Sequence, residues 1–163
     1  MKTLLLIRHA KSSWDNPLES DFDRPLNERG KTDAPAMAKK IRKHKIDLDA
    51  IVSSPARRAL ETATFFSKEF KLDTKKIHLA PALYEASGPD FSKTVASLDD
   101  SQKVIALFAH NPGITDFINS LKCTFVSDMP TCGVYAIKIK TKTWRDFGAA
   151  DKKFLFLEYP KNS

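Results

Sequence analysis

Short apolar runs alternate with longer segments of helical period along the chain, and this alternation limits the folds that are possible. The apolar runs predict strands over Thr3–Ile7, Ala50–Ser53, Lys76–Leu79, Lys103–Ala109, Val134–Lys140 and Lys153–Glu158. The longer segments predict helices over Glu28–Lys43, Pro55–Phe70, Phe91–Leu98 and Pro112–Leu121. Strands that alternate with helices pack as a largely parallel sheet with helices on both faces. The sequence therefore predicts an α/β fold, a three-layer α/β/α sandwich with a mostly parallel central sheet.

The last two predicted strands follow each other without room for a full helix, which predicts an antiparallel edge. The first strand and the run VIALFA are apolar almost throughout, as strands buried on both faces are. The chain has 163 residues and no repeat or long linker, so we expect one domain over residues 1–163. No apolar stretch reaches the roughly 20 residues that span a bilayer, so we expect no membrane partner.

The net charge of +7 is compatible with nucleic acid, an acidic partner, a phosphorylated substrate or only a solvated surface. The clearest basic cluster, residues 39–45, keeps Ile41 as an apolar position, and a helix that buries one stripe gives the same pattern. We therefore expect no nucleic-acid partner. Cys123 and Cys132 have neither a metal-type spacing nor a disulfide framework, which favours a reducing cytoplasm.

Two helix starts are marked by a polar residue followed by proline. Ser54 with Pro55, and Asn111 with Pro112, predict an N-cap and a proline in the first helical position. Both helices follow an apolar strand directly. In an open α/β sheet, ligands bind in the crevice at the carboxyl ends of such strands.

Three strands are expected to end at this edge of the sheet in polar residues of matching chemistry. The first delivers Arg8 and His9, and the second runs into SSPARRALET, which places arginines in the first helical turn. The third, VIALFA, delivers His110 and then Asn111. Arginine forks suit phosphate oxygens, and helix N-termini add amide donors. The sequence therefore predicts a site for a phosphoryl group.

Other chemistries fit these residues less well. A metal ion would be repelled by the arginines, and no carboxylate directly follows any of the three strands, so we expect no metal. A Walker-type phosphate loop is absent. Cys132 precedes a strand and no arginine follows it, which indicates packing rather than a cysteine nucleophile. The remaining interpretation is a neutral histidine that attacks phosphorus without a cofactor, because imidazole needs no base to activate it.

The ordered motifs resemble the histidine phosphatase superfamily, whose members include the phosphoglycerate mutases. RHA at 8–10 resembles the Arg-His-Gly motif that opens this family. PLNERG at 25–30, SSPARRALETA at 53–63, LYEAS at 83–87 and HNPG at 110–113 resemble its later segments in order. The resemblance implies a phosphoglycerate mutase-like fold. Ala10 replaces the glycine of the first motif, which indicates that φ is negative there.

By position, the resemblance also implies roles for site residues. These are His9 as the phosphorylated nucleophile, Arg8 and Arg58 as the phosphate-binding arginines, His110 as the second pocket histidine, and Asn111 as a further substrate contact. Glu85 corresponds to the usual proton donor, and the alternative of a solvated loop carboxylate stays open. Arg57 is expected to face solvent or an acidic neighbour.

The lengths of the segments between the motifs indicate which subgroup of this superfamily the chain resembles. The segments from Arg58 to Glu85 and from Glu85 to His110 are short and leave little material for a lid. An open site suits a phosphorylated side chain of another protein. The chain therefore resembles the SixA type, whose members remove phosphate from phosphohistidine on signalling or phosphotransfer proteins. Two alternatives stay open, a small-molecule phosphomonoesterase that acts on a small phosphate ester, and a non-catalytic phosphate- or nucleic-acid-binding module.

Overall fold

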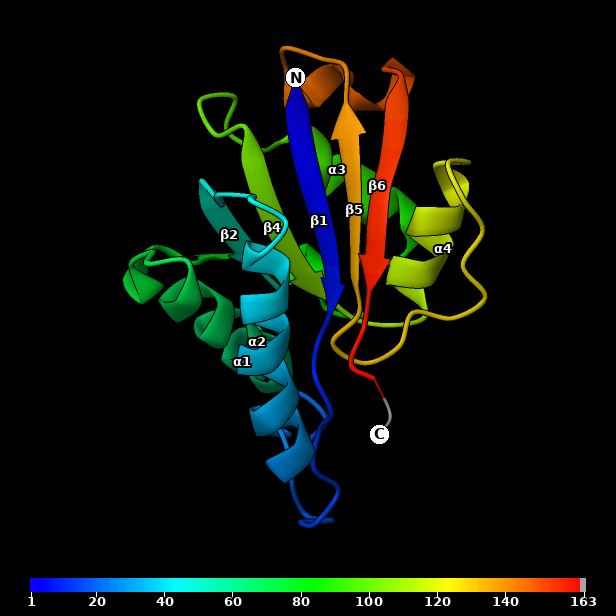
Figure 1. The fold of residues 1–163 in the computed structure, drawn as a ribbon. Coiled ribbons are helices and arrows are strands. Elements are labelled where there is room, and N and C mark those ends of the chain that lie inside the picture. The colour runs from blue at the N-terminus through cyan, green and yellow to red at the C-terminus, as the bar shows by residue number, and fades with distance from the viewer. Residues whose placement is uncertain (162–163) are drawn as a thin grey trace.

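A six-stranded sheet forms the centre of the computed structural model, which describes residues 1–161 (Figure 1). Its strands are β1 (Lys2–Arg8), β2 (Ala50–Ser53), β3 (His78–Leu79), β4 (Val104–Ala109), β5 (Val134–Ile139) and β6 (Lys152–Glu158). They lie in the order β3-β2-β4-β1-β5-β6. The first four strands pair in parallel, whereas β5 runs antiparallel to both of its neighbours. The predicted mostly parallel sheet with an antiparallel edge is confirmed.

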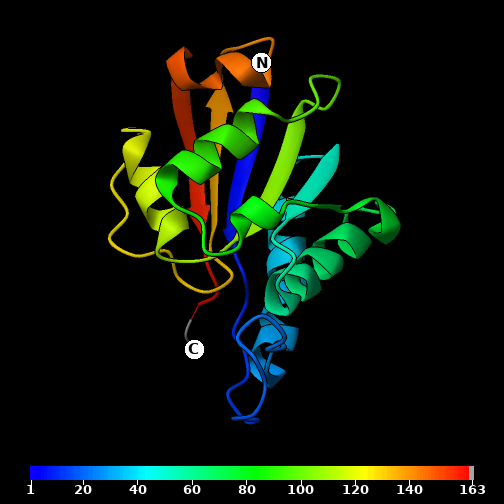
Figure 2. The same ribbon diagram turned by 180° about the vertical axis from the view of Figure 1, so that it is seen from behind.

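Helices cover both faces of this sheet. The helices are α1 (Glu28–Arg42), α2 (Arg57–Glu69), α3 (Gly88–Ala96) and α4 (Gly113–Ser120), with 3₁₀ turns η1 (Thr74–Lys76), η2 (Pro81–Leu83) and η3 (Trp144–Ala149). α1 and α2 share one hydrophobic core with one face of the sheet, and α3 and α4 share a second core with the other face, which Figure 2 shows from behind. Among the described residues, no helix is long and apolar enough to cross a membrane.

The side chains of β1 explain why both faces are covered. Leu4 and Leu6 lie in the core formed with α3 and α4, whereas Leu5 and Ile7 lie in the core formed with α1 and α2. Alternate residues of a strand point to opposite faces. All four of these side chains are fully buried, as the apolar run predicts for a strand between two helical layers. The three-layer prediction is confirmed.

The predicted cap at Ser54 was wrong. α2 begins at Arg57, and the residue before it, Ala56, makes no side-chain cap. The Ser54 hydroxyl accepts a hydrogen bond from the Ala56 N–H at 3.2 Å and lies 2.7 Å from Nε2 of His110. The Ser54 hydroxyl therefore holds both the turn before α2 and the ring of His110 in place.

Several boundaries shift by one or two residues, and two differences have a clear local cause. The strand predicted over Lys76–Leu79 is reduced to β3, because the residues before it form η1. The third predicted helix begins earlier, at Gly88, because Ser87 and Asp90 form a capping box at its start. Both differences lie in short segments where periodicity is a weak signal.

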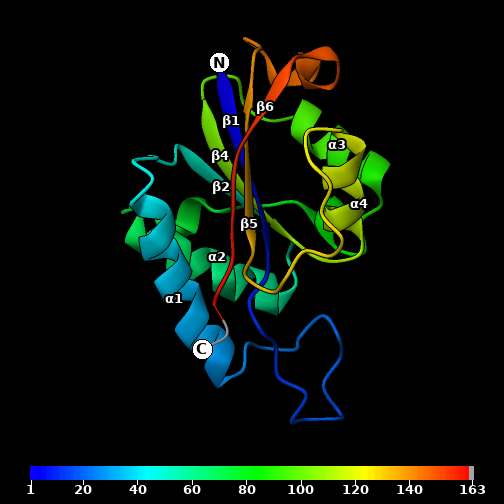
Figure 3. The ribbon, with the colours of Figure 1, turned by 45° about the vertical axis from the view of Figure 1, so that its right-hand side comes forward.

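The loop at residues 11–27, called the rim loop below, extends beyond the carboxyl ends of the strands (Figure 3). Its two ends meet, because the N–H of Asn27 donates to the carbonyl of Lys11 at 3.0 Å. Asn27 also caps α1 by accepting from the N–H of Gly30 at 2.8 Å. A Cβ at Gly30 would lie 2.2 Å from the Lys11 carbonyl oxygen, so this close approach requires glycine.

Candidate active site

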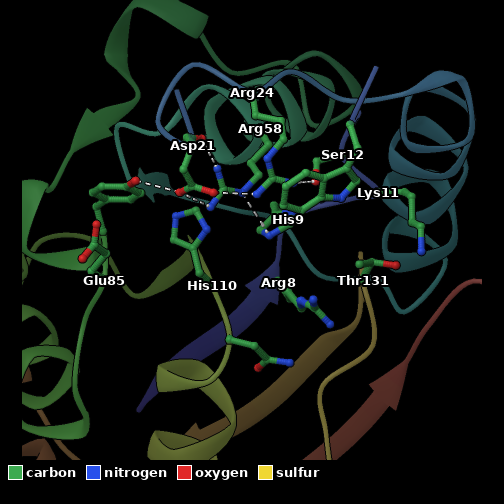
Figure 4. Close-up of a pocket in the computed structure, with 13 residues that line it drawn as sticks. Arg8, His9, Lys11, Ser12, Asp21, Arg24, Arg58, Glu85, His110 and Thr131 are labelled. Carbon is green, nitrogen blue, oxygen red and sulfur yellow. Dashed lines mark hydrogen bonds and ion pairs between the residues drawn. The ribbon is translucent and has the colours of Figure 1, made fainter. Parts of the chain in front are cut away.

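The carboxyl ends of β1, β2 and β4 meet at one edge of the sheet, because the register pairs Arg8 with Ala109 and Ser53 with Phe108. A cavity of about 390 Å³ opens at this edge. The lining includes all the residues that the sequence predicts for the site, namely Arg8, His9, Arg58, Glu85, His110 and Asn111 (Figure 4). The fold therefore brings together residues that are far apart in the sequence.

His9 directly follows β1 and is buried. Its Nδ1 lies 2.7 Å from the carbonyl oxygen of Ala10, which can only accept a hydrogen bond, so Nδ1 carries the proton. The other ring nitrogen, Nε2, is therefore unprotonated and carries a lone pair. The guanidinium Nε of Arg58 donates toward this Nε2 at 3.4 Å. The site thus presents an unprotonated imidazole nitrogen beside a fixed positive charge.

The surroundings of His9 keep its ring neutral. Burial is the largest cause and lowers the pKa of His9 to about 3. The hydrogen bond to the Ala10 carbonyl opposes this shift, and the nearby His110, Arg58 and Arg8 add to it. A neutral imidazole is the form that can attack phosphorus.

His110 lies opposite His9, with 5.1 Å between the ring centres. Its Nε2 is held at 2.7 Å from the Ser54 hydroxyl. Burial, followed by the charge of Arg58, lowers the pKa of His110 to about 3. Its Nδ1 is buried and has no hydrogen-bond partner among residues 1–161. Because an unpaired buried polar atom costs free energy, this nitrogen is available to a ligand.

Arg58 and Arg8 supply positive charge on two sides of the site. Arg58 lies in the first turn of α2 and is only 6% exposed. Arg8 donates from Nη1 to the Met129 carbonyl at 2.8 Å, and its buried Nε has no hydrogen-bond partner in the part of the chain that the structure describes. Guanidinium groups with free donors suit the oxygens of a phosphoryl group.

Asn111 lines the cavity, but it is not the N-cap that the sequence predicts. α4 begins at Gly113, after Pro112. The Asn111 amide donates to Asp128 at 2.7 Å and to the Met129 carbonyl at 3.0 Å, and its oxygen accepts from Thr115 at 2.6 Å. The Asn111 side chain therefore holds the segment around Met129, to which Arg8 also donates. A direct contact between Asn111 and the substrate stays a prediction.

Glu85 lines the cavity from its exposed side. Its backbone φ is +55°, in the left-handed region. The carboxylate makes no hydrogen bond or ion pair with any other residue in the range 1–161. The structure places Glu85 near the site without fixing its carboxylate, so both interpretations of this residue stay open.

Further residues line the cavity that the sequence analysis did not assign to the site. The rim loop contributes Lys11, Ser12, Trp14, Asp21 and Arg24, the residue after η2 is Tyr84, and the segment before β5 contributes Thr131. Asp21 is the most consequential, because its carboxylate accepts from Nη2 of Arg58 at 3.1 Å. The residues predicted at the three strand ends, Arg8, His9, Arg58, His110 and Asn111, include no carboxylate, but the fold adds Asp21 beside them. The hydrophobic pattern of a sequence does not show how a loop folds back onto the sheet. The sequence therefore gives no signal for the contact between Asp21 and Arg58 beyond the charged stretch before PLNERG.

A metal ion and a cysteine nucleophile are the two alternatives to histidine chemistry in this region. Within residues 1–161, no three His, Cys, Asp or Glu side chains are grouped so that they could hold a metal ion. Cys132 is fully buried in the core with α1 and α2, and burial raises the pKa of its thiol. A buried, protonated thiol is unreactive, which agrees with the packing role that the sequence predicts.

Comparison with known proteins gives one family. The family model described as the histidine phosphatase superfamily (branch 1) matches residues 4–113. An uncharacterized chloroplastic protein of Arabidopsis thaliana is 26% identical over 89% of this chain and 70% of its own length. A 2,3-bisphosphoglycerate-dependent phosphoglycerate mutase of Bartonella henselae is 32% identical over 56% of this chain, but that match spans only 45% of the mutase.

A solved structure has the same fold along almost the whole chain. It is a candidate phosphohistidine phosphatase SixA from Agrobacterium tumefaciens, with a TM-score of 0.80 and 24% identity. The match covers 98% of this chain and 99% of that one. The predicted phosphoglycerate mutase-like fold class is confirmed.

We expect the rings of His9 and His110 to stay neutral down to about pH 5, because burial disfavours the imidazolium form. Nitrogen chemical shifts of ¹⁵N-labelled histidine measure this, and His9→Ala and His110→Ala variants assign the signals. The unfolded chain binds protons at these residues below about pH 6.5, whereas the folded chain does not until about pH 3. Their contribution therefore lowers the free energy of unfolding as the pH falls through this window. A midpoint near 6.5 for either folded ring would contradict the description of the site.

Proposed function

The chain belongs to the histidine phosphatase superfamily, and from this premise we propose that it removes phosphate from phosphohistidine on another protein. It is a phosphatase of the histidine-nucleophile class. The observation that carries the proposal is the neutral His9 nitrogen beside the buried Arg58, in a cavity that opens to solvent. We also propose that the reaction takes place in the cytoplasm, where the free thiols of Cys123 and Cys132 would persist.

The proposed reaction has two displacements at phosphorus. Nε2 of His9 attacks the phosphorus, and the bond from phosphorus to the substrate nitrogen breaks with its electron pair on the departing ring. The proton on Nδ1 of His9 keeps its hydrogen bond to Ala10, which stabilises the positive ring of the phosphoenzyme. Water then attacks the phosphorus, which restores neutral His9 and releases inorganic phosphate. Arg8 and Arg58 offer donors to the oxygens that carry charge in both steps.

The rim of the cavity supports a protein substrate. Trp14 is 77% exposed and Leu18 is 94% exposed, and both lie on the rim loop. Trp14 also lines the cavity, where its ring stacks on the guanidinium of Arg24 at 3.8 Å. Exposed apolar side chains beside a functional site are typical of a surface that binds another protein.

The fold comparison supports the same substrate class, because the Agrobacterium protein, named as a candidate phosphohistidine phosphatase, has the same fold over 98% of this chain. In the described residues, the segments between α2 and β4 form only η1, β3, η2 and α3. These segments add no further helix or strand over the cavity, so a side chain presented by a folded partner can enter it.

A small-molecule phosphomonoesterase is the second candidate. It is favoured by Glu85, which lines the cavity, and by the 32% identity with the mutase. An alkyl phosphate must expel an alkoxide, so it needs a proton donor such as Glu85 in the transition state. Phosphohistidine can leave as neutral imidazole, and its need for an enzyme acid is smaller.

The substrate class is tested by comparing kcat/KM for a phosphohistidine protein, 3-phosphoglycerate and an aryl phosphate. We expect the protein to be the best substrate. Leu18→Ser should lower kcat/KM for the protein by roughly tenfold and leave the aryl phosphate unchanged, because Leu18 lies on the rim loop but does not line the cavity. Leu79→Ser is the matched control, since Leu79 is also exposed but lines a different cavity. Fastest turnover of 3-phosphoglycerate, abolished by Glu85→Gln, would establish the second candidate instead.

The neighbouring arginines give a second test. Arg58 is buried in the cavity, whereas Arg57 is exposed and pairs with Glu19 and Glu61, as the sequence predicts. Arg58→Ala should lower kcat by roughly 10²-fold or more, because a charge contact to the transition state is lost. Arg57→Ala should change kcat by less than about threefold. Equal losses in the two variants, measured with one substrate, would contradict the assignment of Arg58.

A further inference from the structure

The carboxylate of Asp21 lies among three donors at the inner side of the rim loop (Figure 4). One oxygen accepts from Nη2 of Arg24 at 2.7 Å. The other accepts from the hydroxyl of Tyr84 at 2.7 Å and from Nη2 of Arg58 at 3.1 Å. The backbone carbonyl of Asp21 also accepts from Nη1 of Arg58 at 2.6 Å. A carboxylate with this many contacts has a fixed position beside the phosphate-binding arginine.

Asp21 is a permanent anion in this position. Burial opposes its ionisation, but the hydrogen bonds from Arg24 and Tyr84 and the charge of Arg58 outweigh burial and hold the pKa of Asp21 well below its ordinary value. The hydrogen bond from Tyr84 to Asp21 raises the pKa of Tyr84 to about 12, so Tyr84 keeps its proton and stays a donor. Asp21 can therefore accept a hydrogen bond or attract a cation, but it cannot serve as a proton donor.

Arg58 separates Asp21 from the nucleophile. Its Nε faces Nε2 of His9, whereas its Nη atoms face Asp21, so the two residues flank one guanidinium group. Asp21 lines the same cavity as His9, on the far side of Arg58, so the leaving group of a substrate bound in this cavity can meet its carboxylate.

Half of the Asp21 side chain is exposed, so it remains accessible to a substrate. When a phosphoryl group binds, its oxygens compete for the Nη donors of Arg58. Any donor that Arg58 withdraws leaves a carboxylate oxygen of Asp21 ready to accept from the leaving group. Arg24 keeps that carboxylate in place, because it binds the other oxygen.

We propose that Asp21 determines specificity by favouring a leaving group that carries a protonated ring nitrogen and by repelling one that carries a carboxylate. The proposal rests on the proposed function, because it takes His9 as the nucleophile. In phosphohistidine, the ring nitrogen that is not bonded to phosphorus carries the proton and donates it as a hydrogen bond to Asp21. When the bond from nitrogen to phosphorus breaks, its electrons stay on the ring, which leaves as neutral imidazole. Asp21 keeps its charge and no proton is transferred.

The charge of Asp21 acts in the opposite direction on small organic phosphates such as 3-phosphoglycerate or phosphoserine. Each of these carries a carboxylate a few bonds from its phosphate, and two like charges at that separation in a partly buried site repel each other. The cavity still attracts a phosphoryl group, since Arg8, Arg24 and Arg58 all line it. Asp21 therefore distinguishes substrates by their leaving group and not by their phosphate.

The test compares Asp21→Asn with wild type on phosphoimidazole, 3-phosphoglycerate and an aryl phosphate. Phosphoimidazole has the proposed leaving group without a protein, so rim contacts do not contribute. We expect Asp21→Asn to lower kcat/KM for phosphoimidazole by about tenfold and to raise it for 3-phosphoglycerate, because a hydrogen bond to a charged group is lost and a repulsion is removed. The change in kcat/KM for the aryl phosphate should lie between the changes for the other two substrates.

Asp23→Asn is the matched control. Asp23 lies on the same loop and bonds to Ser20 at 2.9 Å, but it does not line the cavity. It should leave the ratio of the three values unchanged. The readout is this ratio within one variant, so loss of folded protein does not affect it.

Each result has a definite meaning. A change of ratio in Asp21→Asn alone supports the proposal. Equal changes for all three substrates would mean that Asp21 only competes with phosphate for Arg58 or holds the loop, and the proposal would be overturned while the proposed function stands. If the wild-type enzyme hydrolyses neither phosphoimidazole nor a phosphohistidine protein, the proposed function and the proposal about Asp21 are both overturned.

Discussion

The buried charge of Arg58 is the constraint on which the site depends. A guanidinium that is only 6% exposed must have its donors satisfied, and the chain supplies His9 on one side and Asp21 on the other. The same charge helps to keep both histidines neutral, since it lowers the pKa of each. It also holds the rim loop, because Asp21 receives two of its three donor nitrogens. One side chain therefore links the nucleophile, the second histidine and the entrance of the cavity.

The sheet explains how so polar a site can be built rigidly. β1 and β4 are buried on both faces, so the residues that follow them have backbone positions fixed by the core. His9 follows β1 and His110 follows β4, and the parallel register brings the two rings to 5.1 Å. The order of the strands therefore determines which residues meet, and the polar residues need only occupy the first positions after each strand.

Much of this arrangement could be predicted from the sequence, because strand ends are visible as the end of an apolar run. Arg8, His9, Arg58 and His110 all lie at or just after such an end, and the structure brings them into one cavity. Asp21 could not be predicted in the same way, since it lies within a loop whose path depends on tertiary contacts such as those of Gly30. The caps at Ser54 and Asn111 were predicted wrongly for a related reason. Each side chain also bonds to a residue distant in sequence, and in both cases the helix begins one or two residues later than the pattern implies.

The most direct test of the account is to trap the phosphoenzyme. Wild-type enzyme mixed with a phosphohistidine protein and quenched rapidly should carry an acid-labile phosphoryl group on His9, identified by mass spectrometry of the peptide. His78→Ala, which alters an exposed histidine outside the cavity, should be labelled like wild type, and His9→Ala should carry no label and show no turnover. Labelling that persists in His9→Ala, or that maps to another residue in wild type, would contradict the assignment of His9 as the nucleophile.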